Sequence, residues 1–208
     1  MSPYLIDLVD RMSVKEPPMN SEQSVSWHAL REAELLDDAG LIPQLAVALQ
    51  CEKDKSRRGS LCFVIGKIGK NTRHPECTSI LLKQVTSEKD KYLLHSIFNL
   101  LADLPKRTDQ EVDTIVSFWA DSRHLIRHSA ISALGNTDNP HAELAILRHL
   151  AATTDAQDQI QCHAVLSTIG TLQAIPLLER ALSSRKRDVK AFAVWAIRAI
   201  HERDTAES

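Results

Sequence analysis

The chain has 208 residues, of which 43% are apolar and 25% are charged, a composition typical of a globular protein. Its 25 Lys and Arg against 27 Asp and Glu give a formal net charge of -2, so a nucleic-acid partner would need a local basic patch. No run of 18 apolar residues occurs, and the first residues lack the basic and apolar regions of a signal peptide. We therefore expect a cytoplasmic protein without a membrane span.

The N-terminal part of the chain differs in charge from the rest. Residues 1–40 carry a net charge of −5, whereas residues 41–208 carry +3. A short amphipathic helix is predicted, with four apolar residues on one face: Leu5, Leu8, Val9 and Met12. Pro17-Pro18 then interrupts any helix, which predicts a linker, and a further helix is expected from Ser26 to Gly40. We assign residues 1–25 to an acidic N-terminal helix with a Pro-rich linker.

From residue 41 onward, one helical pattern recurs five times. Segments at intervals of 33, 36, 32 and 31 residues share apolar positions i, i+3, i+4 and i+7, and they end near Gly66, Asn99, Gly135, Ser167 and Arg198. Another apolar helix is predicted before each of them, at 41–50, 77–86, 110–119, 141–151 and 172–182. No segment alternates with period two, so no sheet is expected.

The fragments GLIPQLAVALQ…RRGSLCFVIGKIG and AIPLLERALSS…DVKAFAVWAIRAI resemble the HEAT repeat and its HEAT-like, PBS-lyase type. This resemblance covers roughly 41–202. It implies an all-α fold, a right-handed α-solenoid of about five antiparallel helix pairs whose second helices line a concave face. We assign the array to 26–203 and a tail to 204–208. The family's turn Asp, followed six residues later by Arg, is matched only by Asp121 and Arg127, so the repeats are diverged.

The resemblance implies a binding role, because most such arrays bind proteins or nucleic acids. Searches for a nucleophile elbow, a phosphate loop, GxGxxG and HExxH find nothing, so no catalytic residue and no cofactor are expected. The favoured function is a non-catalytic scaffold, either an adaptor or an inhibitor or immunity-type protein. Its partner protein would bind to the concave face and the C-terminal end.

Two other classes stay open. The first is a nucleic-acid-binding protein, including a DNA-repair glycosylase that could recruit Asp90, Asp158, Tyr92 and Trp195. The second is a bilin lyase or chaperone, for which no tetrapyrrole pocket is recognisable. The iron-dependent deoxyhypusine hydroxylases need several His-Glu dyads, and the sequence contains only His201-Glu202.

Candidate contact residues follow from the register of the second helices. Positions −8, −4 and 0 from each repeat end are expected on the concave face. The predicted partner-binding residues are Arg58, Lys91, Tyr92, His95, Arg127, His128, Gln159, His163, Lys190, Trp195 and Arg198. The same register places on this face Cys62, Gly66, Asn99, Ile131, Gly135, Ser167 and Val194. Two interpretations of the basic ladder stay open: a groove for an acidic or phosphate-bearing partner, or arginines that bond the turns of neighbouring repeats.

Three further features could carry function. Trp195 stands beside Phe192 in a stretch, 185–203, of net charge +4, which predicts either a contact site or a C-terminal cap. His124 and His128 have a spacing that can place two imidazoles on one metal. Without a Glu between them or a predictable third ligand, they are interpreted as exposed polar residues, and no metal is expected. The acidic N-terminal segment could fold over the array, as autoinhibition or as simple capping.

The four cysteines fit no zinc or disulfide pattern, because Cys51, Cys62, Cys77 and Cys162 are separated by 11, 15 and 85 positions. Reduced, mostly buried thiols are expected.

Overall fold

The computed structural model describes residues 1–17 and 20–207, which form twelve α-helices, four short 3-10 helices and no strand. The all-α prediction is therefore confirmed. Contacts between residues divide the chain into two compact units, Met1–Leu104 and Pro105–Ser208, here called unit 1 and unit 2.

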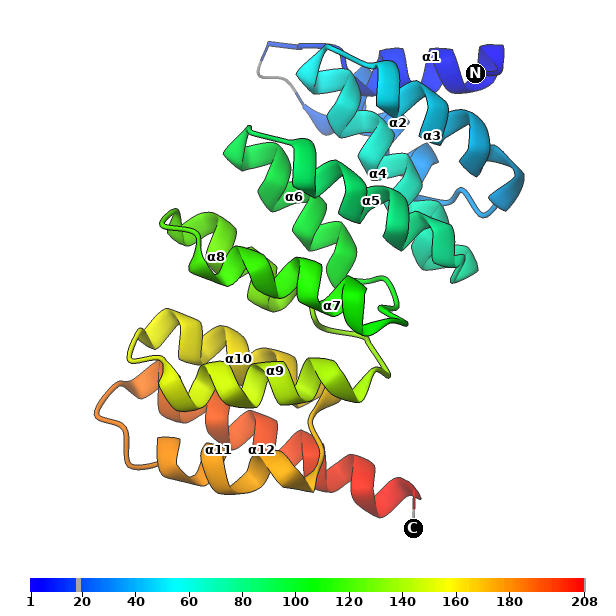
Figure 1. The fold of residues 1–208 in the computed structure, drawn as a ribbon. Coiled ribbons are helices and arrows are strands. Elements are labelled where there is room, and N and C mark those ends of the chain that lie inside the picture. The colour runs from blue at the N-terminus through cyan, green and yellow to red at the C-terminus, as the bar shows by residue number, and fades with distance from the viewer. Residues whose placement is uncertain (18–19, 208) are drawn as a thin grey trace. The chain divides into compact units, whose positions relative to one another are not determined.

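Unit 1 is built from two layers of helices (Figure 1). Its elements are α1 (Pro3–Met12), η1 (Ser21–Gln23), α2 (Val25–Glu34), η2 (Ala39–Leu41), α3 (Ile42–Cys51), α4 (Lys55–Thr72), α5 (Pro75–Ser87) and α6 (Lys91–Ala102). α3 pairs with α4, and α5 pairs with α6. The first helices of these pairs, α3 and α5, contact each other, as do the second helices, α4 and α6. α1 and α2 form an additional pair that packs on α4.

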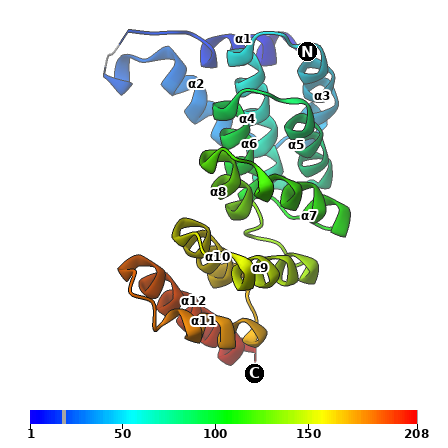
Figure 2. The same cartoon turned by 60° about the vertical axis from the view of Figure 1, so that its left-hand side comes forward.

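Unit 2 repeats this arrangement. Its elements are α7 (Asp109–Val116), η3 (Ser117–Ala120), α8 (His124–Ser132), α9 (Pro140–Ala152), α10 (Ala156–Ile169), η4 (Leu172–Ala174), α11 (Ile175–Ala181) and α12 (Arg187–Glu207). α8 contacts α10 and α10 contacts α12 in the layer of second helices; Figure 2 shows the latter two side by side. α7, α9 and α11 form the layer of first helices.

The five predicted helix pairs are all present, with bounds that differ by a few residues. Three differences are larger. The helix predicted from Ser26 to Gly40 ends at Glu34 and is followed by the separate turn η2. α4 continues six residues past Gly66, to Thr72, and the segment assigned to a tail is helical through Glu207. The predicted linker contains a 3-10 turn at 21–23, and Pro18 lies outside the described residues.

Two local signals recur at the helix starts and explain why the pairs form. The first helices α3, α5, α9 and α11 each carry a proline in the first turn, where its fixed φ suits the helix and its missing N–H costs no bond. The second helices α4, α6 and α10 are capped by Asp54, Asp90 and Asp155, whose carboxylates accept backbone N–H groups at 2.8–3.0 Å. Three of the five pairs, α3–α4, α5–α6 and α9–α10, thus carry both a proline at the start and an aspartate at the turn.

The acidic N-terminal segment is anchored to unit 1. The four predicted apolar residues of α1 are buried, Asp10 pairs with Arg57, and Ser13 Oγ lies 2.9 Å from Ser60 Oγ. Beyond the helix, the Glu16 carboxylate accepts bonds at 2.7–3.1 Å from Ser24 Oγ, Ser26 Oγ and the N–H groups at the start of α2. These contacts cap unit 1, which is the simpler of the two roles expected for the segment.

Side chains from other elements also cap the carbonyl ends of helices. Arg203 on α12 donates to the main-chain oxygens of Ser167 and Gly170 at the end of α10, and Asn71 on α4 donates to those of Glu34 and Leu36 after α2. Such bonds satisfy carbonyls that the helix itself leaves without a donor. They tie each helix pair to its neighbour within a unit.

Candidate functional site

The first arginine of the predicted ladder is paired with an acidic residue of the next repeat. Arg58 donates from Nε to Glu88 Oε2 at 3.0 Å and from Nη1 to the main-chain oxygen of Lys53 at 2.6 Å. Burial opposes ionisation of Glu88, but the bonds from Arg58 and from the N–H groups of Asp90 and Lys89 outweigh it and hold the Glu88 pKa below its ordinary value. The charge of Arg58 is thus balanced within unit 1.

Arg127 occupies the equivalent place in unit 2. Its Nε donates to both oxygens of Asp158, at 3.0 and 3.1 Å, and its Nη2 donates to His124 Nδ1 at 2.8 Å. Its Nη1 bonds the main-chain oxygen of Asp121 at 3.3 Å, whereas the Asp121 carboxylate pairs with Arg123. For both arginines, the geometry favours the interpretation in which the ladder bonds the turns of neighbouring repeats.

A group of polar side chains surrounds Asp158, and we call it the α8–α10 polar cluster: Arg127, His128, His149, Asp155 and Asp158. His128 Nε2 lies 3.1 Å from Asp158 Oδ1, and His149 Nε2 lies 3.3 Å from Oδ2. Neither ring nitrogen has a well-aligned hydrogen-bond partner, although both are shielded from solvent. Burial, the largest influence, and the charges of Arg127 and His124 lower the His128 pKa, against the opposing effect of the two aspartates.

The sequence pattern does not bring these residues together. It pairs His128 with His124 and lists it as a contact residue, and it gives Asp158 only as a candidate glycosylase acid. His149 and Asp155 carry no prediction from the sequence. A signal was present, because Asp158 follows Arg127 by 31 residues and Glu88 follows Arg58 by 30, both close to one repeat length.

The cluster also holds the ligand set that could bind a metal ion. Among the described residues, His128, Asp155 and Asp158 offer ligand atoms that all lie within 4.8 Å of one another. His124 does not join this set, because its Nδ1 is occupied by Arg127.

Several positions of the predicted face are buried, and the prediction of partner contact is wrong for them. His163 is fully buried, with its Nδ1 donating to the main-chain oxygen of Val189 on α12 at 3.2 Å. Burial lowers the pKa of His163 to about 4, so the ring is neutral. The other predicted residues that are buried are Cys62, Gly66, Ile131, Gly135 and Ser167. These positions face a neighbouring second helix. In a layered array, a second helix packs against the second helices of the adjacent repeats as well as against the first helix of its own pair.

The predicted residues of α6 form a partly exposed group in unit 1. Tyr92 is 61% exposed, and Lys91 Nζ lies 4.9 Å from the centre of its ring. His95 Nε2 accepts from Asn99 Nδ2 at 3.1 Å. In unit 2, the half-buried Gln159 instead donates to the main-chain oxygen of Thr153 at 3.2 Å, a bond within its own repeat.

The exposed side of the last helix gathers the remaining predicted residues, and we call it the α12 surface: Lys190, Phe192, Val194, Trp195 and Arg198. Trp195 and Val194 are each 50% exposed, and Phe192 packs edge-on against Trp195 with ring centres 5.8 Å apart. Arg198 pairs with Glu202 on the same helix. In the part of the chain that the structure describes, no ion pair engages Arg185, Lys186, Arg187 or Lys190, and all four are exposed.

The thiols and the other tryptophans are placed as structural groups. The cysteines are all free, and only Cys51 is exposed. Burial raises the pKa of Cys62 to about 12 and of Cys77 to about 11, so these thiols are unreactive. Trp119 is buried against His149, with ring centres 4.9 Å apart, whereas Trp27 is partly exposed under Arg31.

Comparison with known proteins shows the fold alone. No family model and no curated protein matches the chain. A designed armadillo repeat protein aligns with a TM-score of 0.53 and 15% identity, over 93% of this chain and 98% of that one. A crystal structure of an engineered protein aligns with a TM-score of 0.52 and 17% identity, over 94% and 96% of the two chains. The chain therefore has a helical-repeat fold similar to that of armadillo-type proteins. No helix within the described residues is long and apolar enough to span a membrane.

Proposed function

We propose that this chain is a non-catalytic, HEAT-like scaffold of the adaptor, inhibitor or immunity type, which binds an acidic segment of a partner protein through the α12 surface. The observation that carries the proposal is the half-exposed Trp195, flanked by Val194 and edge-on Phe192, on a helix whose Arg187 and Lys190 form no ion pair within the described residues. Trp and Arg side chains dominate the energetics of protein interfaces, especially where apolar groups and charges alternate. Helical repeats present such side chains on rigid surfaces.

The basic residues before and at the start of α12 favour an acidic partner. Arg185, Lys186, Arg187 and Lys190 form no ion pair in the described part of the chain, whereas Arg58 and Arg127 are already paired with acidic residues of the next repeat. A nucleic acid would also be attracted to these four cations, and its bases could stack on Trp195, but it would leave Val194 without an apolar contact. A protein segment with acidic and apolar residues satisfies both kinds of group.

We also propose a second contact for the partner in unit 1. It consists of Lys91, Tyr92 and His95 on α6. The half-buried Arg58, Arg127, His128 and Gln159 contact residues of their own units and offer no free charge to a partner. We also propose a cytoplasmic location.

The experiment is affinity capture from the native lysate with and without nuclease, using the parent chain and a Trp195→Ala/Lys190→Glu variant. We expect a protein partner that survives nuclease, binds the parent and is lost with the variant. The matched control is Trp27→Ala/Arg31→Glu, which removes the exposed Trp and adjacent cation of unit 1 and should keep binding.

Direct titration with the purified partner then separates the classes. Binding to nucleic acid should weaken steeply with salt because counterions are released, whereas binding to a protein through Trp195 should depend less on salt. Recovery of nuclease-sensitive material, or equal capture by both variants, would contradict the proposal.

A further inference from the structure

We propose that His128, Asp155 and Asp158 of the α8–α10 polar cluster form a binding site for a divalent transition-metal ion, of which Zn²⁺ is the probe. The site lies between two neighbouring repeats of unit 2, with the histidine on α8 and the aspartates at the start of α10. Its occupant would link these helices.

The first argument is the spacing of the ligand atoms. The three atoms lie within 4.8 Å of one another, and His128 Nε2 is 3.1 Å from Asp158 Oδ1. Zinc binds nitrogen and carboxylate oxygen at about 2.0–2.2 Å, so two ligands of one tetrahedral zinc are roughly 3.3–3.5 Å apart. The His128–Asp158 separation is thus close to one edge of a coordination shell, and a small movement of the more exposed Asp155 completes the set.

The second argument concerns the Nε2 atom of His128. His128 Nε2 is shielded from solvent, and it has no well-aligned hydrogen bond despite its short distance to Asp158. Buried polar groups in proteins are normally hydrogen-bonded, so one without a partner requires an explanation. A metal ion explains this atom, because the lone pair of Nε2 would then bind the metal in place of a hydrogen bond.

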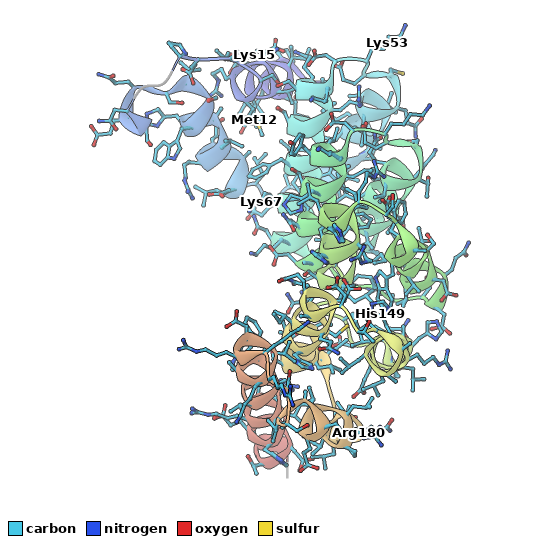
Figure 3. The ribbon with its side chains drawn as sticks, turned by 90° about the vertical axis from the view of Figure 1, so that its left-hand side faces the viewer. Met12, Lys15, Lys53, Lys67, His149 and Arg180 are labelled. Atoms are coloured by element: carbon cyan, nitrogen blue, oxygen red, sulfur yellow. The ribbon has the colours of Figure 1, made fainter. Side chains whose placement is uncertain are left out.

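The surrounding groups suit the outer shell of such a site. Arg127 donates to Asp158 through Nε, and its Nη2 lies 3.5 Å from Asp155 Oδ2, so one cation faces two carboxylates and leaves a net negative charge for the metal ion. Carboxylates that bind metals are commonly held by a second partner in this way. His149, labelled in Figure 3, approaches the opposite oxygen of Asp158 and Thr153 Oγ1 lies 3.4 Å from the same atom. The mixed nitrogen and oxygen donors favour Zn²⁺ and similar ions over Mg²⁺.

The test uses the untagged full chain with Cys51→Ser, because Cys51 is the exposed thiol and could bind zinc by itself. After treatment with a chelator, calorimetric titration with ZnCl₂ should show one equivalent bound and a Tm that rises to a plateau. Asp155→Asn should weaken binding at least tenfold. An Asn still accepts the N–H groups that Asp155 Oδ1 now accepts, so α10 stays capped.

Two further variants make the result specific. His128→Ala should also weaken binding at least tenfold. His141→Ala is the matched control, because His141 pairs with Asp113 at 2.8 Å on the same unit but outside the cluster, and it should leave the affinity within twofold. Circular dichroism of the metal-free variants checks that they fold.

The proposal is overturned by the absence of a saturable Zn²⁺ signal. It is equally overturned if neither Asp155→Asn nor His128→Ala changes the affinity, since the ion would then be bound adventitiously elsewhere. Competition by Mg²⁺ at equal concentration would show a carboxylate-only site and would also contradict it.

Discussion

Arg58 on α4 and Glu88 at the end of α5 form an ion pair of 3.0 Å that joins two consecutive repeats. Arg127 and Asp158 repeat the same relationship in unit 2, also at 3.0 Å. In each case the arginine also bonds a main-chain oxygen in the turn of its own repeat. One side chain thereby fixes a turn and the neighbouring repeat together.

Replacing Arg58 with Ala should destabilise unit 1 by about 2 kcal/mol, because Glu88 would be left nearly buried without its cation. Urea unfolding of Arg58→Ala, Glu88→Gln and the double variant measures the coupling between the two residues. Lys91→Ala is the control, since this exposed residue should change stability by less than about 0.5 kcal/mol. Additive effects of the two single variants would contradict the assigned pairing.

Glu16 is expected to make the N-terminal cap sensitive to acid. Hydrogen bonds from the Ser24 and Ser26 side chains, followed by the N–H groups of Val25 and Ser26, lower its pKa from 4.5 to about 2. A depressed carboxyl pKa stabilises the fold above the unfolded value, so this contribution is complete above about pH 4.5 and is lost as pH falls toward 2. Glu16→Gln should lack this part of the pH dependence, measured as Tm between pH 2 and 6. Parallel profiles for the two proteins would refute it.

His163 should cause a second loss of stability on acidification, in a pH range above that of Glu16. Because burial lowers its pKa from 6.5 to about 4, the unfolded chain takes up a proton below pH 6.5 that the folded chain takes up only near pH 4. Stability is therefore full above pH 6.5 and falls as pH decreases through this window. The neutral variant His163→Gln should flatten the decline between pH 6.5 and 4 in urea unfolding. An unchanged slope would show that His163 is protonated in the fold.

The helix pairs could be predicted from the sequence because the 3.6-residue apolar pattern and the proline and aspartate signals are local. Exposure of Lys91, Lys190 and Arg198 followed from the same register. The burial of His163 did not, because it depends on a neighbouring helix that a single helical stripe does not reveal. The α8–α10 polar cluster was missed for the same reason, since its members lie in three different helices or turns and meet only after the repeats stack.

Arg203 is expected to hold the end of α10 to α12. It donates to three carbonyls, those of Leu166, Ser167 and Gly170, and removing it takes a donor from each, although the Leu166 oxygen still accepts from the Gly170 N–H. Arg203→Ala should cost about 1–3 kcal/mol in urea unfolding. Arg198→Ala is the control on the same helix, because its pair with Glu202 is exposed to solvent and contributes little to stability. Equal losses for the two variants would contradict the capping role.

Two glycines of α4 should respond in opposite directions to the same substitution. A Cβ at Gly69 would lie 2.6 Å from Cys77 Cβ and 2.9 Å from Leu104 Cδ2, so Gly69→Ala should force α4 away from its neighbours and cost about 1–3 kcal/mol. At Gly59 the nearest atom is Leu93 Cδ1 at 3.7 Å, an ordinary contact. Because Gly is about 0.5–1 kcal/mol less favourable than Ala inside a helix, Gly59→Ala should stabilise the protein. The free energies of unfolding of the two variants test both signs, and a destabilising Gly59→Ala would show that the backbone of α4 needs glycine there for a reason other than space.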